Sequence, residues 1–198
     1  MARVFHEKLM AFLNDITKTD VLGKSIGRIY AVEFQESGNP HAHVLLIVHY
    51  DDRPRSPNDW NKHIQAVIPD RDDDPELYEI ITKFNLHGPC QGKRCSKETG
   101  KCKYRYPLPF QDETIVLPNG IVELKRPNNG RFFIGHNNIR FTNRDVVSYC
   151  PELSKKYNCH ICVLPCATKM AGIRYLFSYV LKGEGAAMVK LHQKDLEE

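Results

Sequence analysis

Apolar and polar positions along the chain predict both helices and strands. Residues 4–17 carry apolar side chains at helical spacing, which predicts an amphipathic helix. Residues 27–35 (GRIYAVEFQ) and 41–48 (HAHVLLIV) are rich in apolar and β-branched side chains and are separated by ESGNP. A five-residue loop that contains glycine commonly joins two antiparallel strands, so we expect a hairpin here.

Helical patterns return in the middle of the chain, at 58–68 and 75–86. Asp74 is placed to cap the second of these helices, and Pro75 suits its first position. Residues 169–182 predict a closing helix.

Three further stretches predict short strands. ETIVLPNGIVELK is expected to form a hairpin around Asn119 and Gly120, RFFIGHNNIRF a second strand pair, and NCHICVLP a single strand. The chain has no internal repeat and no long linker. We therefore expect one α+β domain over residues 1–198, with a central, mainly antiparallel sheet and flanking helices. Residues 87–106, rich in Cys, Gly and Lys, are expected to form an insertion in it.

Composition narrows the class of protein. A hydrophobic fraction of 41% and a charged fraction of 26% are typical of a globular domain. No apolar run approaches the roughly 18–20 residues that cross a bilayer, and charges interrupt the N-terminus, unlike in a signal peptide. This predicts an intracellular protein without a membrane partner. The seven cysteines show no secreted framework, which favours reduced thiols or a metal site over disulfides.

Positive charge is concentrated in one segment. The net charge is only +4, but residues 93–106 carry six Lys or Arg against one Glu, whereas residues 70–79 are acidic. Such a basic stretch can meet phosphate groups or can be a solvated loop. On charge alone, both interpretations stay open.

Two histidines stand at the start of the second predicted strand. His41 and His43 project from one face, since alternate residues of a strand share a face. Glu33 and Gln35 share a face of the preceding strand, and a loop that sets Gln35 opposite His41 sets Glu33 opposite His43. Two imidazoles and one oxygen ligand leave coordination positions open, which suits catalytic Mg²⁺ or Mn²⁺. Alternatively, the imidazoles make hydrogen bonds in the core, and a one-residue slip would separate the groups.

Three polar residues cluster on the predicted closing helix, opposite its apolar stripe: Tyr175, Tyr179 and Lys182. Residues four apart stack on one helix face, so both hydroxyls can reach one site. A phenol is a poor nucleophile at neutral pH, but a polarised phosphate and a neighbouring cation favour its attack on phosphorus. Two such tyrosines permit two successive strand transfers. The alternative is that the rings pack in the core.

Several stretches together resemble the Rep endonuclease domain of Helitron transposases, within the HUH superfamily of rolling-circle initiators and relaxases. They are EFQESGNPHAHVLLIV, DPELYEIITKFNLHGPC, GKCKYRYPLPF, KYNCHICV and IRYLFSYVLKG, and the resemblance covers most of the chain from about residue 27 to 183. The resemblance implies an HUH/Rep-like fold and metal-dependent, tyrosine-mediated cleavage of single-stranded DNA. The enzyme would remain on the 5′ phosphate and leave a free 3′ hydroxyl.

Residue by residue, the resemblance implies a catalytic metal ion on His41 and His43. A third ligand is expected from the preceding strand, with Glu33 as the first choice and Gln35 as the second. The loop ESGNP departs from the family, which more often has a basic residue before the glycine.

The paired nucleophiles of the family fall on Tyr175 and Tyr179, and Lys182 matches the lysine three residues after the tyrosine. We expect Tyr175 to make the first cleavage. The implied partners are single-stranded DNA, at transposon ends and target, and a helicase domain in the full-length protein. A eukaryotic transposon that acts in the nucleus follows from the same resemblance.

A histidine and three cysteines follow the spacing His-x2-Cys-x4-Cys-x6-Cys: His87, Cys90, Cys95 and Cys102. Four nitrogen and sulfur ligands form a closed set typical of structural Zn²⁺, and unliganded thiols are the alternative. Bound zinc would present the basic side chains of this segment to DNA phosphates, with Tyr104 and Tyr106 available for base stacking. The basic side chains are Lys93, Arg94, Lys101, Lys103 and Arg105.

The remaining cysteines near the C-terminus are Cys159, Cys162 and Cys166. The first two would point to opposite faces of the predicted strand. Buried small side chains are therefore favoured over a second metal site.

Three functions stay open. The leading one is the metal-dependent single-strand endonuclease and strand transferase of Helitron transposition. The others are a rolling-circle replication initiator of a virus or plasmid, and a non-catalytic, zinc-containing DNA-binding module. Formation of a covalent adduct with DNA separates the binding module from the two enzymes.

Overall fold

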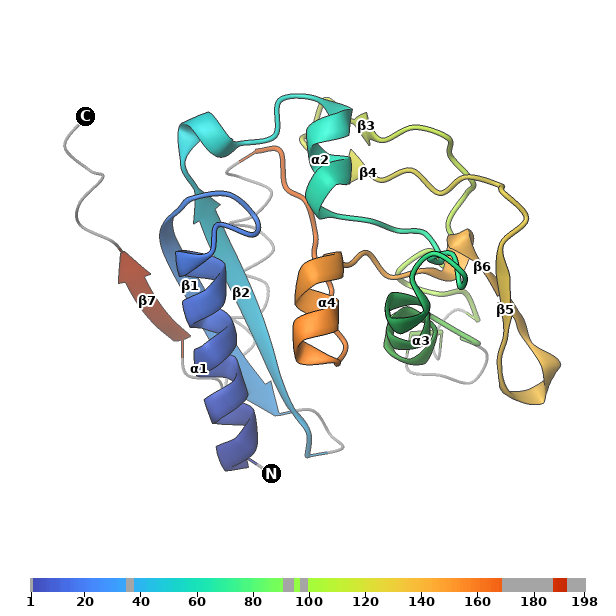
Figure 1. The fold of residues 1–198 in the computed structure, drawn as a ribbon, viewed down its shortest axis with the longest axis horizontal. Coiled ribbons are helices and arrows are strands. Elements are labelled where there is room, and N and C mark those ends of the chain that lie inside the picture. The colour runs from blue at the N-terminus through green and yellow to red at the C-terminus, as the bar shows by residue number, and fades with distance from the viewer. Residues whose placement is uncertain (1, 35–37, 91–94, 97–99, 169–186, 192–198) are drawn as a thin grey trace. The chain divides into compact units, whose positions relative to one another are not determined.

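A computed structural model describes residues 2–34, 38–90, 95–96, 100–168 and 187–191 of the 198-residue chain (Figure 1). The chain divides into two compact units. Unit 1 comprises residues 1–55, 119–121 and 166–198, and unit 2 comprises residues 56–118 and 122–165. A single HUH domain with residues 87–106 as an insertion stays a prediction.

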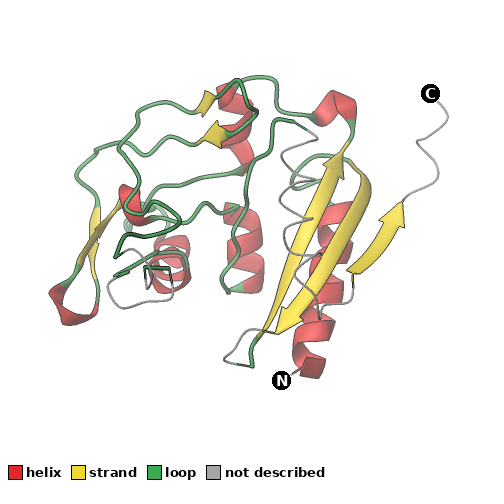
Figure 2. Cartoon of the chain, turned by 180° about the vertical axis from the view of Figure 1, so that it is seen from behind, coloured by secondary structure: helices red, strands yellow, loops and turns green. Residues whose placement is uncertain are grey.

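Unit 1 contains a long helix and a three-stranded antiparallel sheet (Figures 1 and 2). The elements are α1 (Ala2–Lys18), β1 (Ser25–Phe34), β2 (Pro40–Val48) and β7 (Ala187–Leu191), with the strand order β2-β1-β7. The apolar stripe of α1 buries Leu9, Leu13 and Ile16, and the helix packs against β1 and β2. The predicted N-terminal helix and the hairpin that follows it are both present.

Buried Arg28 joins α1 to β1. Its Nη1 donates to the backbone carbonyl of Leu13 and, over 3.0 Å, to the hydroxyl of Thr17. Because a buried charge is costly unless it is hydrogen-bonded, these bonds fix the helix on the strand pair that carries the two histidines.

The register of this hairpin differs from the prediction by two residues. Glu33 lies opposite His41, so the predicted pairs of Gln35 with His41 and of Glu33 with His43 were wrong. The prediction had assigned Pro40 to the loop, but proline fits the first position of an edge strand, which β2 is among the described strands. A two-residue shift preserves the faces, so Glu33, His41 and His43 still share one.

Unit 2 consists of short elements joined by long loops (Figure 2). The helices are α2 (Pro57–His63), α3 (Pro75–Phe84) and α4 (Pro151–Tyr157), and the strands are β3 (Ile115–Val116), β4 (Val122–Glu123), β5 (Phe132–Ile134) and β6 (Arg140–Thr142). β3 pairs with β4 and β5 with β6, each antiparallel, as the sequence predicted. Asp74 caps α3 by accepting a hydrogen bond from the N–H of Leu77 over 3.1 Å, also as predicted. Short 3-10 helices lie at His136–Asn138 and Asn143–Asp145 in unit 2, and at Tyr50–Asp52 in unit 1.

The segment after α4 differs from the prediction. Asn158 ends the helix in a left-handed conformation (φ 44°), and residues 158–165 contain no strand. Cys162 and Cys166 are exposed, so the expected burial of these thiols was wrong. The predicted closing helix at 169–182 lies outside the described residues.

The chain is of the mixed α+β class, as predicted. In the described part of the chain, the strands fall into three antiparallel sheets of three, two and two strands rather than one central sheet. β7, which the sequence did not predict, supplies the third strand of the largest sheet. None of the described helices combines the length and the hydropathy that a membrane span requires.

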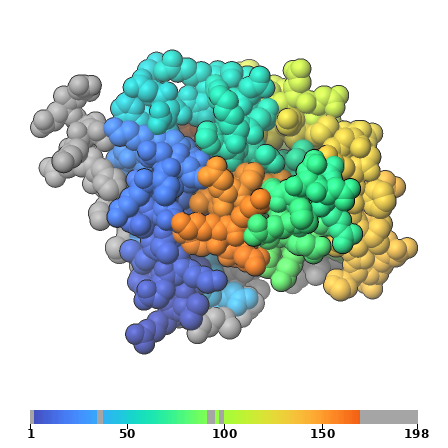
Figure 3. Space-filling view, viewed as in Figure 1, coloured from blue at the N-terminus to red at the C-terminus, as the bar shows by residue number. Residues whose placement is uncertain are grey.

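The core of unit 2 gathers around α3. Ile68, Leu77, Ile81, Val146 and Tyr149 are buried together there. α4 packs against α3, and Figure 3 shows the two as adjoining green and orange surfaces.

Asn143 holds several loops of unit 2 together. The residue is 1% exposed, and its Oδ1 accepts the N–H of Ile68 over 2.7 Å. Its Nδ2 donates to the carbonyl of Pro127 over 2.7 Å and to Oδ1 of Asn129 over 3.1 Å. The loop before the β5–β6 hairpin is thereby tied to the core.

Asn143→Ala is expected to lower the free energy of unfolding by about 2–4 kcal/mol, because each buried partner left without a hydrogen bond costs about 1–3 kcal/mol. Urea denaturation followed by circular dichroism measures the change. Asn128→Ala is the control, since Asn128 is exposed and should contribute less than about 0.5 kcal/mol. Equal losses in the two variants would show that the Asn143 bonds add nothing specific.

Candidate functional site: strand histidines and a Cys/His cluster

Glu33 and the two strand histidines lie on one face of the β1–β2 hairpin. His43 is 7% exposed, and its Nε2 lies 3.2 Å from Oε1 of Glu33, whose side chain is 45% exposed. The His41 and His43 rings meet edge to face with their centroids 4.7 Å apart. The carboxylate therefore contacts His43 diagonally across the strands, while it lies opposite His41 in the register.

This face supplies the donor types that divalent ions accept, namely imidazole nitrogen and carboxylate oxygen. Among the described residues, one group of three or more His, Cys, Asp or Glu side chains is close enough together to hold a metal ion, and it is in unit 2. Glu33, His41 and His43 are not a second such group.

The other catalytic candidates lie outside the described residues: Gln35, Tyr175, Tyr179 and Lys182. Their roles remain predictions from the sequence.

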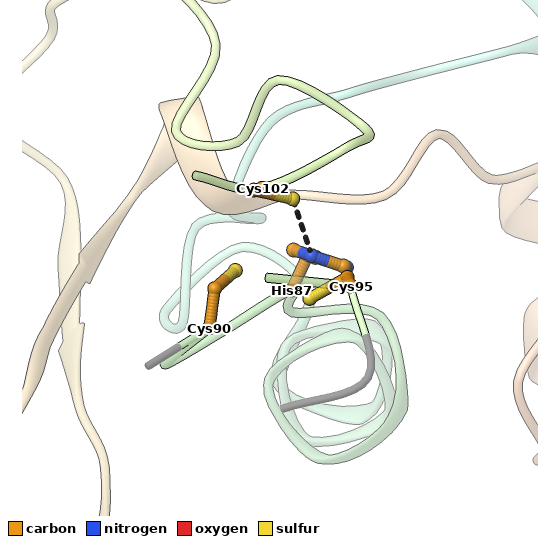
Figure 4. A group of neighbouring side chains, drawn as sticks. All are labelled: His87, Cys90, Cys95 and Cys102. Carbon is orange, nitrogen blue, oxygen red and sulfur yellow. Dashed lines mark hydrogen bonds between the residues drawn. The ribbon is translucent and has the colours of Figure 1, made fainter. Parts of the chain in front are cut away.

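Unit 2 gathers one histidine and three cysteines into a cluster (Figure 4). His87, Cys90, Cys95 and Cys102 are half-buried, and their ligand atoms all lie within 4.8 Å of one another. Nε2 of His87 is 3.2 Å from Sγ of Cys102. The three cysteines are free thiols. The residues that the spacing selected are thus brought together in space.

Backbone hydrogen bonds position the cluster. His87 follows α3, and its N–H donates to the carbonyl of Asp145 over 2.8 Å. The N–H of Lys103 donates to the carbonyl of Cys95 over 2.8 Å, which sets Cys102 beside Cys95. Ligands from both ends of the loop therefore meet next to the core of unit 2.

The thiols influence one another's ionisation. Burial, followed by the two neighbouring thiols, raises the pKa of Cys90 to about 12. Burial acts in the same direction on Cys102, but the backbone N–H groups of Tyr106 and Tyr104 and the other thiols hold its pKa below the usual value. Closely spaced thiols cannot all ionise without repulsion, and a bound cation would remove that repulsion.

The donor set fits Zn²⁺. In tetrahedral zinc sites the bonds are about 2.3 Å to sulfur and about 2.0 Å to nitrogen, so neighbouring ligand atoms lie about 3.4–3.8 Å apart. The four observed atoms lie within 4.8 Å, and small side-chain rotations would bring them to this spacing. Four protein ligands complete the tetrahedron and leave no position for substrate, which is typical of a structural site.

Tyr106 supports His87 in a way that the sequence analysis missed. The two rings stack with centroids 4.3 Å apart and an interplanar angle of 25°. Burial raises the pKa of the Tyr106 phenol, and burial also lowers the pKa of His87, against the opposing charge of Asp145. Tyr106 is therefore packed against the cluster, and the expectation that it is available for base stacking was wrong. In the sequence, the sign that Tyr106 packs on the cluster is its position four residues after Cys102.

The basic side chains of the segment are open to solvent where the structure describes them. Lys101, Lys103 and Arg105 are exposed, and Tyr104 is 52% exposed. Nζ of Lys103 lies 5.0 Å from the centre of the Tyr104 ring. A pocket of about 390 Å³ adjoins Lys103 and Tyr104. Two further basic candidates lie outside the described residues: Lys93 and Arg94.

A comparison with known protein families finds a match in the N-terminal part of the chain. Residues 1–46 match the family model described as "Helitron helicase-like domain at N-terminus". The matched segment contains α1, β1 and the part of β2 that carries both histidines. This region of the chain is therefore Helitron-associated. No curated protein shows significant similarity to the chain.

Proposed function

We propose that the chain is the metal-dependent, single-strand DNA endonuclease and strand transferase of Helitron rolling-circle transposition. The observation that carries the proposal is the face formed by His41, His43 and Glu33, with carboxylate and imidazole 3.2 Å apart, inside the Helitron-like segment 1–46. The protein then acts in the nucleus on transposon ends and target DNA, as one HUH domain joined to a helicase domain in the full-length protein.

His41 and His43 would hold the catalytic Mg²⁺ or Mn²⁺, with Glu33 as third ligand and Gln35 as the alternative. When bound, the ion polarises a phosphoryl oxygen of the scissile phosphate. Contact with the Glu33 carboxylate orients the His43 ring and favours a fixed tautomer. Burial of His43 limits the ring to few orientations, which suits a ligand that must hold its geometry.

Tyr175 or Tyr179 would supply the nucleophile, and Lys182 would favour the phenolate form as a nearby cation. The phenol gives up its proton and its oxygen bonds to phosphorus, while the P–O3′ bond breaks. The freed 3′ oxygen takes up a proton, and the 5′ phosphate stays on the tyrosine as an ester. The bond energy is conserved, so a later 3′ hydroxyl can reverse the step and rejoin a strand.

The experiment that tests the proposal is detection of a covalent protein–DNA adduct on a denaturing gel. The chain is incubated with a mixed pool of single-stranded oligonucleotides and Mn²⁺, alongside Tyr175→Phe, Tyr179→Phe and the double variant. We expect an adduct that disappears with a chelator and in the double variant, because the metal and a phenol are both needed. Absence of any adduct, with DNA binding intact, would reject the nuclease.

A non-catalytic, zinc-containing DNA-binding module is the second candidate. The gathered His87, Cys90, Cys95 and Cys102 favour it, since a folded basic loop can bind phosphate without any chemistry. Salt-sensitive binding through Lys101, Lys103 and Arg105, without an adduct, is the result expected of such a module.

A further inference from the structure

The β5–β6 hairpin has two faces of different character. Phe132 and Ile134 alternate with Phe133 along β5, and Arg140 lies opposite Ile134 on β6. Phe132, Ile134 and Arg140 are exposed, whereas Phe141, on the other face of β6, is 8% exposed. One face therefore packs inward and the other is open.

The inward face anchors the hairpin to unit 2. Phe133 packs against Tyr78 of α3 with ring centroids 6.4 Å apart, and against Phe141 at the same centroid distance. A Cβ at Gly135 would lie 2.8 Å from the Phe141 ring, so the hairpin is closely packed at the start of its turn. Figure 1 shows the rest of the hairpin projecting beyond α3. The open face is thus held by a fixed base.

The open face carries an aromatic ring paired with a cation. Phe132 is 47% exposed, and the guanidinium carbon of Arg140 lies 4.2 Å from the centre of its ring. Ile134, 44% exposed, continues the apolar strip beside them. An exposed ring beside an arginine can offer a stacking surface and a phosphate contact at the same time.

The charged side chains in the sequence around the hairpin are all basic. Between Glu123 and Asp145 the chain contains five Lys or Arg residues and no Asp or Glu. Two acids near the hairpin have other partners than Arg140: Asp145 accepts the N–H of Thr142 over 2.8 Å in a capping box, and Asp70 pairs with Arg131 at 2.8 Å. Arg140 therefore has no acidic partner among the described residues of its own hairpin, and it gives the open face a positive charge that can meet a phosphate.

From this geometry we infer that the open face of the β5–β6 hairpin binds single-stranded DNA. One base stacks on Phe132, and Arg140 contacts an adjacent phosphate. The choice of DNA as the polyanion rests on the proposed function, but the surface lies apart in sequence from both the strand histidines and the Cys/His segment. The hairpin adds a strand-holding contact that needs neither of the two metal ions.

The two roles differ in their salt dependence, which makes the inference testable. Loss of one phosphate contact lowers the slope of log K against log salt by about 0.7 for single strands, whereas loss of a stacked base lowers affinity without changing the slope. Arg140→Ala should therefore reduce the slope by about 0.7. Phe132→Leu should weaken binding about tenfold at constant slope, and Phe132→Trp should restore it.

Fluorescence anisotropy of a labelled oligothymidylate, measured with the full chain across a range of salt concentrations, gives both quantities. Arg71→Ala is the charge-matched control, because Arg71 is exposed in unit 2 within an acidic stretch and should leave the slope unchanged. Circular dichroism melting checks that each variant is folded. If folded Phe132→Leu and Arg140→Ala bind with the affinity and slope of the parent chain, the hairpin is not a DNA contact.

The outcome is separable from that of the proposed nuclease. If the parent chain forms no adduct but the hairpin variants bind DNA more weakly, the hairpin contact stands and the nuclease is rejected. If the parent chain forms the adduct but the hairpin variants bind as the parent does, the nuclease stands and the hairpin contact is rejected.

Discussion

Cys102→Ser is expected to abolish the binding of one zinc ion per chain and to unfold the segment around it. The apparent binding free energy of structural zinc is about 10–16 kcal/mol, which is comparable with or larger than the 5–15 kcal/mol that stabilises a whole domain. The four ligands come from an irregular loop without a helix or strand in its described residues, so we expect the metal to contribute much of the stability of this segment. Metal analysis of the purified protein and limited proteolysis at residues 87–106 measure the two effects.

Cys166→Ser is the matched control, since Cys166 is exposed and lies outside the cluster. It should retain one zinc ion and the parent pattern of proteolysis. A chelator should convert the parent chain into the Cys102→Ser pattern. If Cys102→Ser keeps its zinc, or the parent chain contains none, the cluster is a group of reduced thiols and the basic loop is held by its backbone bonds alone.

The sequence predicted those parts of the structure that depend on local pattern. Helix α1 follows from apolar spacing, and α3 from that spacing with Asp74 and Pro75 at its start. The Cys/His cluster follows from short ligand spacing, because His87 and Cys102 are only fifteen positions apart and a loop of that length closes at a small cost in entropy. In each case the residues that carry the prediction are close together in the sequence.

Features that depend on distant partners were not predictable in this way. The side chain of Asn143 accepts a hydrogen bond from the backbone of Ile68, 75 residues earlier, and no local sequence pattern near either residue predicts this contact. Tyr106 was predicted to be available for base stacking because it lies in a basic segment, but its ring stacks on the ring of His87. The predicted hairpin register was wrong for a local reason. Pro40 can end a loop or begin an edge strand, and only the observed strand pairing shows that it begins β2.

His43→Ala is expected to slow adduct formation by about 10²–10³-fold. A metal ion that polarises the phosphate contributes several kcal/mol to transition-state stabilisation, and each 1.36 kcal/mol is a factor of ten. Removal of one of two imidazole ligands should forfeit much of that. The rate of adduct formation at saturating DNA, measured against Mn²⁺ concentration, tests this. His6→Ala, a histidine exposed on α1, is the control and should react at the parent rate.

Glu33 decides whether the hairpin face is a metal site or a hydrogen-bonded pair. If its carboxylate is the third ligand, Glu33→Ala should be as slow as His43→Ala, and Glu33→Gln should recover activity at higher Mn²⁺ because an amide oxygen is a weaker donor. If Glu33 only orients the His43 ring across the 3.2 Å contact, both variants should lose about 10–100-fold with no change in the Mn²⁺ requirement. Parent rates in His43→Ala would remove His43 from the proposed metal site. The observed register makes Glu33 the residue to test, since it lies opposite His41 in the strand pairing and its carboxylate contacts His43.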